Sequence, residues 1–267
     1  MKDQDKDLEN QFIDVLLPIC KSKKEYLIKS MESVFNQKIK TRLICILNGM
    51  TNVENEYYVN LLNQYQCMIL ICPKKGVANA LNFAIPFTES SYIARQDDDD
   101  ISHPKRLLMQ KNYLDQNHCD VLGTNIFLID KYDKVKGKRK YPKNDLQCKK
   151  QLIYKSCFCH PSVMMKREFL IKNSYPNLSS EDYALWIKGC KDNVYQNLNH
   201  ELYYYRKHGK QCTVKNKITY LYIKPSIKLI KNYSNNLLER ILNIMKLLFY
   251  IFFYILKSRK IDMKTNL

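Results

Sequence analysis

The sequence SYIARQDDDDISHPKRL, residues 91–107, joins a short apolar run directly to four consecutive aspartates, Asp97–Asp100. Residues 91–96 are typical of a buried β-strand, and the segment from Pro104 to about Asn117 has the apolar spacing of a helix. In open α/β sheets, ligands bind beyond the carboxyl ends of the strands. This stretch therefore predicts a binding site at the tip of a strand in an α/β sheet.

The same alternation of strand and helix extends toward the amino terminus. Three apolar runs rich in β-formers predict strands at residues 12–20, 41–47 and 67–72. Helices are predicted after capping-box patterns at Ser22–Glu25 and Thr51–Glu54, and from Val77 to about Phe87. With a further strand at residues 119–129, this order predicts a doubly wound α/β fold, whose mainly parallel sheet is flanked by helices.

The alternation weakens after residue 130. Residues 131–143 are typical of a basic loop, and short strands and helices continue to about Arg206. From Ile218 onward the pattern is helical. The sequence therefore predicts a main domain over residues 1–213 and a basic, amphipathic helical extension over residues 214–267.

This extension carries half of the formal net charge of +18. From Lys215 to Lys260 there are ten Lys or Arg residues and one acid, Glu239. The uncharged apolar run Leu247–Leu256 is much shorter than the ~20 residues of a spanning helix. Its cationic neighbours favour a helix that lies in an anionic membrane surface. A helix packed on the main domain, or on another protomer, is the alternative.

The net charge and the cysteines indicate the kind of partner and the cellular compartment. A net charge of +18 indicates an anionic partner, such as nucleic acid, anionic lipid or a phosphorylated substrate. The ten cysteines lie mostly in apolar runs, without a disulfide framework or zinc spacing, and the polar amino terminus does not resemble a secretory signal. We therefore expect a cytoplasmic protein.

The four aspartates repel one another unless a cation is present. Carboxylates are ligands that suit Mg²⁺ or Mn²⁺, and such ions usually bridge to substrate phosphates. Because residues two apart on a strand point the same way, we expect Asp97 and Asp99 to face one ligand. A metal held there would neutralise charge on a departing diphosphate. A solvated acidic turn before the helix at Pro104 is the alternative.

A second acidic pair, Glu181–Asp182, lies where Ser179 or Ser180 can cap a helix. Acids in a first helical turn also favour the helix dipole, which is the structural alternative. As a functional group, the pair offers a general base for an attacking hydroxyl. Further along, Arg206 could meet phosphate oxygens, and His208 could ligate a metal.

Seven segments, in order, resemble motifs of family 2 glycosyltransferases, which are inverting enzymes of the GT-A fold. They are DVLLPIC (14–20), SMESVFNQ (30–37), GVANALN (76–82), ARQDDDDISHPKRL (94–107), HPSVMMKRE (160–168), SSEDYALW (179–186) and YYYRKHG (203–209). The resemblance covers roughly residues 12–213. It implies a GT-A-like, Rossmann-like domain of the bacterial surface-glycan type.

The resemblance also implies roles by position. Asp182 would be the catalytic base, and Glu181 beside it would contact the acceptor. Asp99 would hold the metal together with Asp97, which could also contact the donor ribose, while His208 would approach the metal or the diphosphate. The implied nucleotide-sugar site comprises Pro18, Cys20, Asn48, Gly76, Asn79, Asn82, Arg95, Asp97, Asp98 and Arg206.

This chain departs from the family pattern at Asn48, and its four aspartates leave the choice of metal ligands open. Family members often have an acidic residue that reads uracil where this chain has Asn48. An amide offers both a donor and an acceptor to a base edge, so a UDP-sugar stays the expected donor. The run of four aspartates also leaves Asp98 and Asp100 as alternatives within the metal motif.

The sequence thus predicts an inverting hexosyl- or N-acetylhexosaminyltransferase that depends on Mn²⁺ or Mg²⁺. We expect it to act on a glycan or lipid-linked acceptor in cell-surface polysaccharide or lipopolysaccharide biosynthesis, at the inner face of the cell membrane. The alternatives are a metal-dependent nucleic-acid-binding protein and a non-catalytic sugar-nucleotide-binding protein. The clustering of positive charge beside an apolar helix favours a membrane over nucleic acid.

Overall fold

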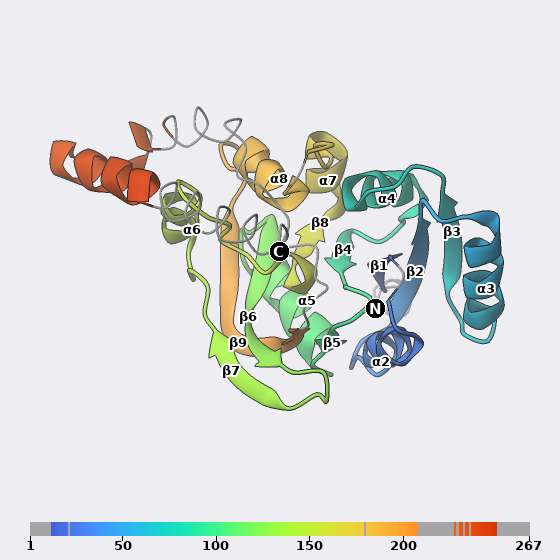
Figure 1. The fold of residues 1–267 in the computed structure, drawn as a ribbon. Coiled ribbons are helices and arrows are strands. Elements are labelled where there is room, and N and C mark those ends of the chain that lie inside the picture. The colour runs from blue at the N-terminus through green and yellow to red at the C-terminus, as the bar shows by residue number, and fades with distance from the viewer. Residues whose placement is uncertain are drawn as a thin grey trace, which may run out of the picture.

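The computed structural model describes residues 12–20, 22–178, 180–207 and 227–249, the last without residues 228, 229, 232 and 235. Within these residues the strands form one sheet in the order β3-β2-β1-β4-β8-β6-β9-β5, with β7 paired to β6 (Figure 1). The strands are β1 (Ile13–Ile19), β2 (Thr41–Asn48), β3 (Met68–Cys72), β4 (Tyr92–Arg95), β5 (Ile101–Ser102), β6 (Val121–Ile129), β7 (Val135–Arg139), β8 (Met164–Lys166) and β9 (Tyr195–Arg206). The helices are α2 (Lys24–Phe35), α3 (Asn52–Leu62), α4 (Val77–Ala84), α5 (Arg106–Gln116), α6 (Asp145–Gln151), α7 (Arg167–Asn173) and α8 (Glu181–Gly189), with short 3-10 turns at Ile85–Phe87 and His160–Ser162.

The amino-terminal half of the sheet is parallel. β1 pairs with β2 and β4, and β2 pairs with β3, all in parallel. β8 then pairs antiparallel with both β4 and β6, and so joins this half to the remaining strands. The predicted α/β class, with a mixed sheet flanked by helices, is confirmed. The second half contains more antiparallel pairs, because short connections such as the one between β6 and β7 can join only antiparallel strands.

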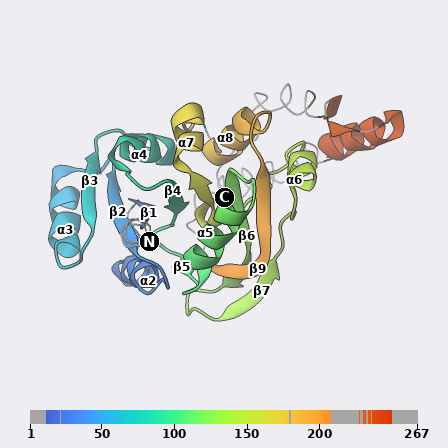
Figure 2. The same ribbon diagram turned by 180° about the vertical axis from the view of Figure 1, so that it is seen from behind.

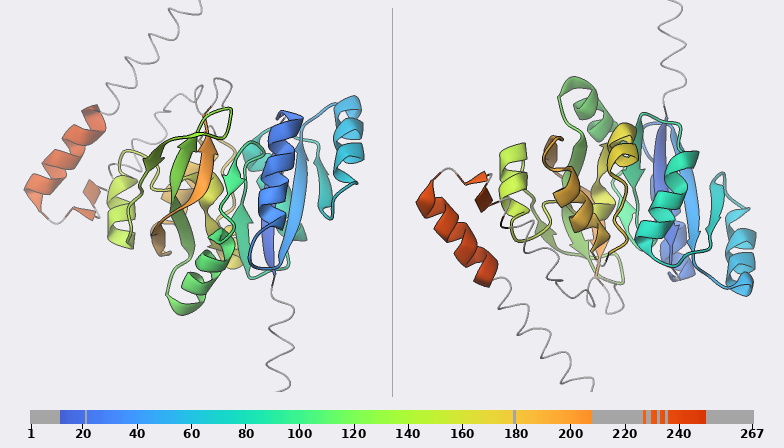
Figure 3. Two further views of the ribbon diagram at one scale, coloured as in Figure 1. Left: turned by 90° about the horizontal axis from the view of Figure 1, so that it is seen from below. Right: turned by 90° about the horizontal axis from the view of Figure 1, so that it is seen from above.

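Helices cover both faces of the sheet (Figures 2 and 3). Successive strand residues point to opposite faces, so Val15 and Leu17 pack into one apolar layer and Leu16 into the other. The first layer receives α2, α3 and α5, and the second receives α4, α7 and α8. Buried side chains that these helices contribute include Leu27, Leu62, Leu107, Leu81, Leu170 and Leu185. The two layers fix the carboxyl ends of β1, β2 and β4 at one edge.

One local expectation at the start of the domain is wrong. The Ser22–Glu25 capping box does not form, because α2 begins after Lys23 and the Ser22 hydroxyl instead donates to the Asp98 carbonyl oxygen at 3.3 Å. β1 runs through Pro18 to Ile19, within the predicted strand, since β4 pairs with β1 only as far as Leu16 and needs no donor from the proline. The predicted Thr51–Glu54 capping box is present.

The basic segment 131–143 is not a loop throughout, as the sequence had suggested. Residues Val135–Arg139 form the edge strand β7, which pairs antiparallel with β6. The connecting turn closes because Asp130 Oδ1 accepts hydrogen bonds from the backbone N–H groups of Tyr132 and Lys134, at 2.8 and 3.0 Å. Lysines that alternate with small or apolar residues were therefore a strand pattern, typical of a charged sheet edge.

Gly49 gives a direct test of the connection after β2. Its φ is +57°, and a Cβ atom there would lie 2.5 Å from the backbone of Lys75. We expect Gly49→Ala to lower the free energy of unfolding by about 2–4 kcal/mol, because the substitution adds both strain and a backbone clash. The matched control is Gly137→Ala, whose Cβ would meet only Leu128 Cδ1 at 4.0 Å. Urea denaturation that finds equal small losses for both variants would contradict this placement.

The described part of the carboxyl-terminal extension includes a helix over residues 237–249 that lies beside α6 (Figure 1). Lys150 of α6 binds Glu239 at 2.5 Å, and Asn243 and Leu247 are buried. Many of the helix's other apolar side chains are exposed; they include Leu237, Leu238, Ile241, Met245, Leu248 and Phe249. Among the described residues, the structure has no helix with the length and hydropathy needed to cross a bilayer. The predicted domain boundary at 213 falls outside the described residues and stays a prediction.

Candidate active site

The four aspartates form a turn between β4 and β5, which we call the acid turn (Asp97–Asp100). β4 ends at Arg95, so the strand alternation expected for Asp97 and Asp99 does not apply. The turn nevertheless brings carboxylate oxygens of Asp97, Asp99 and Asp100 within 4.8 Å of one another. Three hard oxygen donors at this spacing suit a divalent cation such as Mg²⁺ or Mn²⁺.

Asp100 is the buried member of the acid turn. Its side chain is fully inaccessible, and Oδ1 accepts a hydrogen bond from the Arg206 backbone N–H at 2.7 Å. Oδ2 has no hydrogen-bond partner in the described part of the chain. Burial, and then the charge of Asp99, raise the pKa of Asp100 well above its usual range. A buried carboxylate oxygen without a donor, beside two other carboxylates, is what a bound cation would stabilise.

Asp98 points away from this group and joins the acid turn to the end of β1. Its Oδ2 accepts a hydrogen bond from the Cys20 backbone N–H at 2.8 Å. Burial, followed by repulsion from Asp99, raises the pKa of Asp98 to about 7. Sequence reasoning left Asp98 and Asp100 as equal alternatives; the structure groups Asp100 with Asp97 and Asp99.

Arg95 lies between the acid turn and the second acidic pair. Its buried guanidinium donates from Nη2 to Asp97 Oδ1 at 2.6 Å. Burial alone would lower the pKa of Arg95, but the negative charges of Asp97 and Glu181 outweigh it and raise that pKa. Asp97 in turn raises the pKa values of both Glu181 and Asp182, after the larger effect of burial. The fold therefore brings together two acidic motifs that lie about 80 positions apart in the sequence.

Glu181 and Asp182 begin α8, directly after Ser180, which has a left-handed φ of 61°. Burial, and then the adjacent charge of Asp182, raise the pKa of Glu181 to about 7. Burial also raises the pKa of Asp182, although the Tyr183 backbone N–H partly opposes this. Carboxyl groups with raised pKa values in one site are suited to proton transfer near neutral pH.

His160 and Tyr175 complete this side of the site. His160 Nε2 lies 3.1 Å from the Tyr175 hydroxyl, and Nδ1 lies 4.0 Å from Glu181 Oε1. Burial, and then Arg95, lower the pKa of His160 well below its usual value, so the ring is neutral and makes no ion pair with Glu181. His160 stands in the HPSVMMKRE segment, for which the sequence predicted no role by position, and Tyr175 was missed, since nothing near it in the sequence marks it.

Arg106 is a second residue that sequence reasoning missed. Its buried guanidinium donates to the Arg95 carbonyl oxygen at 2.7 Å and to the Ser102 hydroxyl at 2.6 Å, and it stacks on the Tyr203 ring. Burial lowers the pKa of Arg106 to about 10. The sequence did contain a signal, because Arg106 occupies a position of the predicted helix where an apolar residue is expected. Arg106 fixes the backbone that leads into the acid turn.

Arg206 is buried and bonded to the acid turn. Its Nε donates to the Asp99 carbonyl oxygen at 2.7 Å, while Nη1 donates to the Asp130 carbonyl oxygen at 3.1 Å and binds the Asp133 carboxylate. The guanidinium also lies 4.2 Å from the centre of the Tyr26 ring. These bonds give Arg206 a positioning role, because they hold the acid turn against the β6–β7 turn, and the expected phosphate contact stays a prediction.

A pair of substitutions tests this role. We expect Arg206→Gln to lower the free energy of unfolding by about 3 kcal/mol, because it removes the charged hydrogen bonds that the buried guanidinium donates to the Asp99 and Asp130 carbonyl oxygens. It should also weaken Mn²⁺ binding. Lys29→Gln is the control, since Lys29 binds the same Asp133 carboxylate at 2.5 Å from an exposed position and should contribute below about 1 kcal/mol. Calorimetry that finds equal effects on stability and on Mn²⁺ affinity would contradict the role of Arg206.

The residues expected to contact the nucleotide are largely bonded to the protein itself. Asn48 Oδ1 accepts the Gly76 backbone N–H at 2.8 Å, which ties the end of β2 to the start of α4. Asn79 donates to the Lys75 carbonyl oxygen at 2.9 Å. Asn82 exchanges two hydrogen bonds with the backbone of Tyr175, at 2.7 and 2.8 Å. These amides shape the edge of the site by fixing its connections.

The remaining expected residues are Pro18 and Cys20, at the end of β1, and His208. Pro18 is buried within β1, and Cys20 is exposed at its end, next to Asp98. Tyr58 of α3 lies near this corner; burial, and then the charge of Asp98, raise its pKa to about 12. His208, the predicted third metal ligand, lies outside the described residues and stays a prediction.

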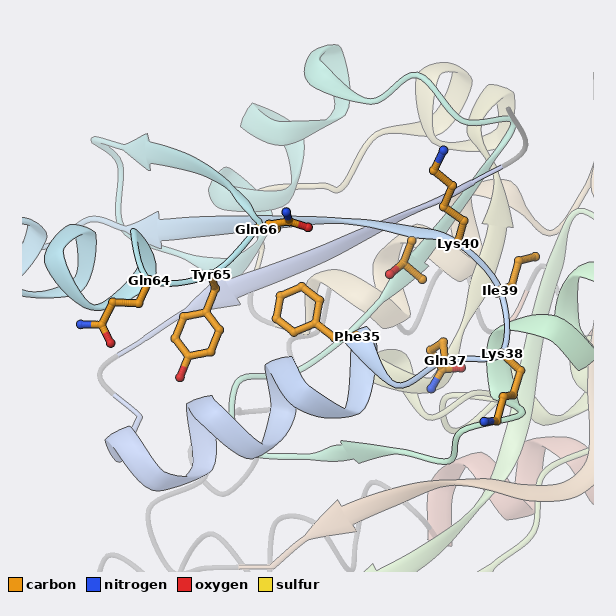
Figure 4. Close-up of a pocket in the computed structure, with 9 residues that line it drawn as sticks. Phe35, Gln37, Lys38, Ile39, Lys40, Gln64, Tyr65 and Gln66 are labelled. Atoms are coloured by element: carbon orange, nitrogen blue, oxygen red, sulfur yellow. The ribbon is translucent and has the colours of Figure 1, made fainter. Parts of the chain in front are cut away.

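A surface pocket lies elsewhere on the domain (Figure 4). Its lining includes the parallel rings of Phe35 and Tyr65, together with Lys38 and Lys40. This pocket borders the beginning of β2, whereas the acid turn and Asn48 lie beyond the opposite, carboxyl ends of the strands. None of its lining residues is acidic, so it is not the site described above.

Known proteins resemble this chain in sequence and in fold. The profile of "Glycosyl transferase family 2" matches residues 14–173. The O-antigen biosynthesis glycosyltransferase WbnJ of Escherichia coli is 34% identical over 218 residues, which cover 78% of this chain and 84% of WbnJ. The UDP-Glc:alpha-D-GlcNAc-diphosphoundecaprenol beta-1,3-glucosyltransferase WfgD of Escherichia coli is 30% identical over 126 residues, 47% of this chain and 48% of WfgD. The crystal structure of S. aureus TarS 1–349 in complex with UDP-GlcNAc shares the fold, with a TM-score of 0.66 at 16% identity, over 91% of this chain and 72% of that chain.

Proposed function

Because the chain belongs to glycosyl transferase family 2, and is a glycosyltransferase, we propose that it transfers a sugar from a UDP-sugar with inversion at the anomeric carbon. The observation that carries this proposal is the buried Arg95, which binds Asp97 of the acid turn and whose charge also opposes the rise that burial causes in the pKa values of Glu181 and Asp182. One group of carboxylates suits a metal-bound diphosphate, and the other suits a base. Direct displacement needs both on opposite sides of the same reacting carbon.

The acid turn supplies the metal ligands in this proposal. Asp97 and Asp99, together with buried Asp100, would hold Mn²⁺ or Mg²⁺, and His208 would be a further ligand. A divalent ion there supplies charge that stabilises the diphosphate leaving group. Arg95 keeps Asp97 oriented, and Arg206 and Asp98 hold the turn in place. The turn is thereby preorganised before the donor binds.

Asp182 is the proposed catalytic base. It would take the proton from the acceptor hydroxyl as that oxygen attacks the anomeric carbon. Glu181, with its raised pKa and its neighbour His160, would contact the acceptor and keep the local charge low. Glu181 and Tyr175 would border the approach of an acceptor sugar to Asp182, since the charges of Glu181 and Asp182 both act on Tyr175.

The donor and acceptor classes rest on the relatives. WfgD is named for a UDP-glucose donor and a diphosphoundecaprenol-linked acceptor, and WbnJ for O-antigen biosynthesis. We extend these classes to this chain as a UDP-sugar donor and a glycan or lipid-linked acceptor, in cell-surface polysaccharide or lipopolysaccharide biosynthesis. Cys20, Asn48, Gly76 and Tyr58 border the corner where the uridine would lie.

Membrane association is part of the same proposal. The helix over residues 237–249 exposes Leu238, Met245, Leu248 and Phe249, and its sequence neighbours are strongly basic. An apolar helix with cationic flanks fits the inner surface of the cell membrane, where a lipid-linked acceptor would be presented. The nucleic-acid and non-catalytic alternatives are supported by no comparable arrangement among the described residues.

A thermal-shift screen tests the donor and the metal together. A ligand that binds only the folded state raises the melting temperature, and the rise grows with the logarithm of the ligand concentration above its Kd. We expect UDP-sugars with Mn²⁺ to raise it clearly, and the same compounds with EDTA to have a much smaller effect. A larger shift with a GDP- or dTDP-sugar would change the donor assignment. No shift with any nucleotide sugar would refute the proposed function.

A further inference from the structure

The β6–β7 hairpin carries a row of cations beside the active site. Residues 131–143 contain seven Lys or Arg and one acid, Asp133. Lys136 and Lys138 lie at alternate positions of the edge strand β7, with 60% and 55% of their side chains exposed. Lys134 and Lys140 flank the strand in the same alternation and are also exposed. Within the described residues, β7 pairs only with β6, so this edge of the hairpin is open.

Intramolecular ion pairs only partly neutralise the row. Lys136 lies 3.2 Å from Asp130, and Lys138 lies 3.7 Å from Glu201. The lysine of each pair is exposed, and ion pairs that reach into solvent contribute little to stability. Lysines on an edge strand also discourage pairing with another sheet. That explanation accounts for one or two of these residues, but it gives no reason for a continuous row.

The shape of the row indicates an extended anionic surface. From Lys134 to Lys140 the backbone covers about 20 Å, at roughly 3.3 Å for each residue of a strand. The cations therefore do not converge on a single phosphate or diphosphate. Tyr132, in the turn before the strand, is exposed at 69%, whereas Val135 alternates with Lys134 and Lys136 and so points to the opposite face. A row of cations that begins beside an exposed aromatic side chain matches the headgroup layer of an anionic bilayer.

The hairpin is also bonded to the catalytic edge. Arg206 bridges them, because it binds Asp133 and the Asp130 carbonyl oxygen on one side and the Asp99 carbonyl oxygen on the other. Tyr26 of α2 donates to the Lys131 carbonyl oxygen at 3.4 Å and so supports the same turn. A contact at the hairpin would therefore fix the position of the acid turn relative to the surface.

We propose that the β6–β7 hairpin, with Lys134, Lys136, Lys138 and Lys140, is a second membrane contact that binds anionic phospholipid headgroups. It is separate from the apolar helix over residues 237–249, and it extends the proposed membrane association on which it rests. The helix would supply apolar insertion, while the hairpin supplies attraction to phosphate and orientation. Two separated contacts hold the acid turn at a defined height over the bilayer, where the helix alone would leave the domain free to rotate.

The test uses the full chain with all four hairpin lysines changed to glutamine. Binding is measured to phosphatidylcholine vesicles that contain about one third phosphatidylglycerol, at low and at physiological salt. We expect at least about 20-fold weaker binding and a flatter salt dependence, since Lys134 and Lys140 should each contribute about fivefold, while Lys136 and Lys138 are partly neutralised by Asp130 and Glu201. The matched control is K105Q/K155Q/K172Q/K191Q, which removes the same charge from exposed positions elsewhere and should bind within about threefold of the parent.

Other arms of the experiment exclude rival explanations. Leu248→Asp should weaken binding to pure phosphatidylcholine vesicles, whereas the hairpin variant should leave that binding unchanged. Equal losses for the hairpin and control variants would overturn the proposal, because only net charge would matter. Tighter, hairpin-dependent binding of the parent to single-stranded DNA than to the anionic vesicles would also overturn it. Hydrolysis of a UDP-sugar by the parent protein is assayed separately, without vesicles. If the parent shows no hydrolysis, the proposed function is refuted, whereas the hairpin contact is not.

Discussion

Asp99→Asn is expected to reduce sugar transfer by at least about a hundredfold, the scale for removing one group that stabilises transition-state charge. The carboxylate oxygens of Asp97, Asp99 and Asp100 lie within 4.8 Å of one another, so loss of one charge weakens the whole metal site. The variant should fold, because removing one of several repelling charges relieves the acid turn when no metal is present. The measurement is kcat at saturating Mn²⁺, with melting temperature recorded in EDTA.

Asp115→Asn is the control for this prediction. Asp115 lies on α5 and pairs with Lys111 at the surface, at 2.6 Å, so its loss should leave turnover unchanged. If Asp99→Asn retains more than about a tenth of parental kcat at any Mn²⁺ concentration, Asp99 is not a ligand of a catalytic metal. Asp97→Asn should behave like Asp99→Asn, with an additional loss from the broken contact to Arg95.

Asp182→Asn should lower kcat by about 10²–10⁴-fold, the range for removal of a general base, while donor affinity changes little. Glu181→Gln should behave differently. The charge of Asp182 raises the pKa of Glu181, so Asp182 ionises first and Glu181 is still protonated when it does. Replacing Glu181 with the neutral Gln should therefore leave the acidic limb of the pH–rate profile in place. A shifted acidic limb in Glu181→Gln, or full activity in Asp182→Asn, would contradict these roles. A pH series of kcat for the three proteins is the measurement.

The raised pKa of Glu181 also makes the free energy of unfolding depend on pH. The pKa of Glu181 rises from 4.5 to about 7 in the folded protein, so the folded state binds a proton that the unfolded state has already released. Glu181 therefore destabilises the fold progressively as pH rises from about 4.5 to about 7, and the penalty persists above that range. Glu181→Gln should remove this pH dependence from the free energy of unfolding in EDTA.

Much of the fold was predictable because its signals are local. Apolar runs closed by turn residues marked β1, β2, β3 and β4, and the Thr51–Glu54 capping box marked the start of α3. The hairpin of residues 131–143 was missed because its strand is exposed on an edge, where charge replaces the apolar pattern. Ser22 misled because its hydroxyl binds Asp98, which is distant in the sequence.

The site was predictable only in part. Acidic residues at a strand tip indicated a metal, and Glu181–Asp182 indicated a base, but their proximity depends on Arg95 and on the course of β8 between them. Arg206 was expected at phosphate because arginine commonly binds it, whereas here buried backbone carbonyl groups take its donors. Such assignments depend on which buried acceptors need a partner, and one sequence does not contain that information.

Calorimetric titration of UDP into the full chain, with Mn²⁺ and then with EDTA, measures the central claim directly. The carboxylates of the acid turn should repel a diphosphate when no cation is present, and should attract it through the ion when one is bound. We therefore predict that UDP binds at least about tenfold more tightly with Mn²⁺ than with EDTA. Equal affinity under both conditions would mean that Asp97–Asp100 do not hold a divalent ion against the nucleotide diphosphate.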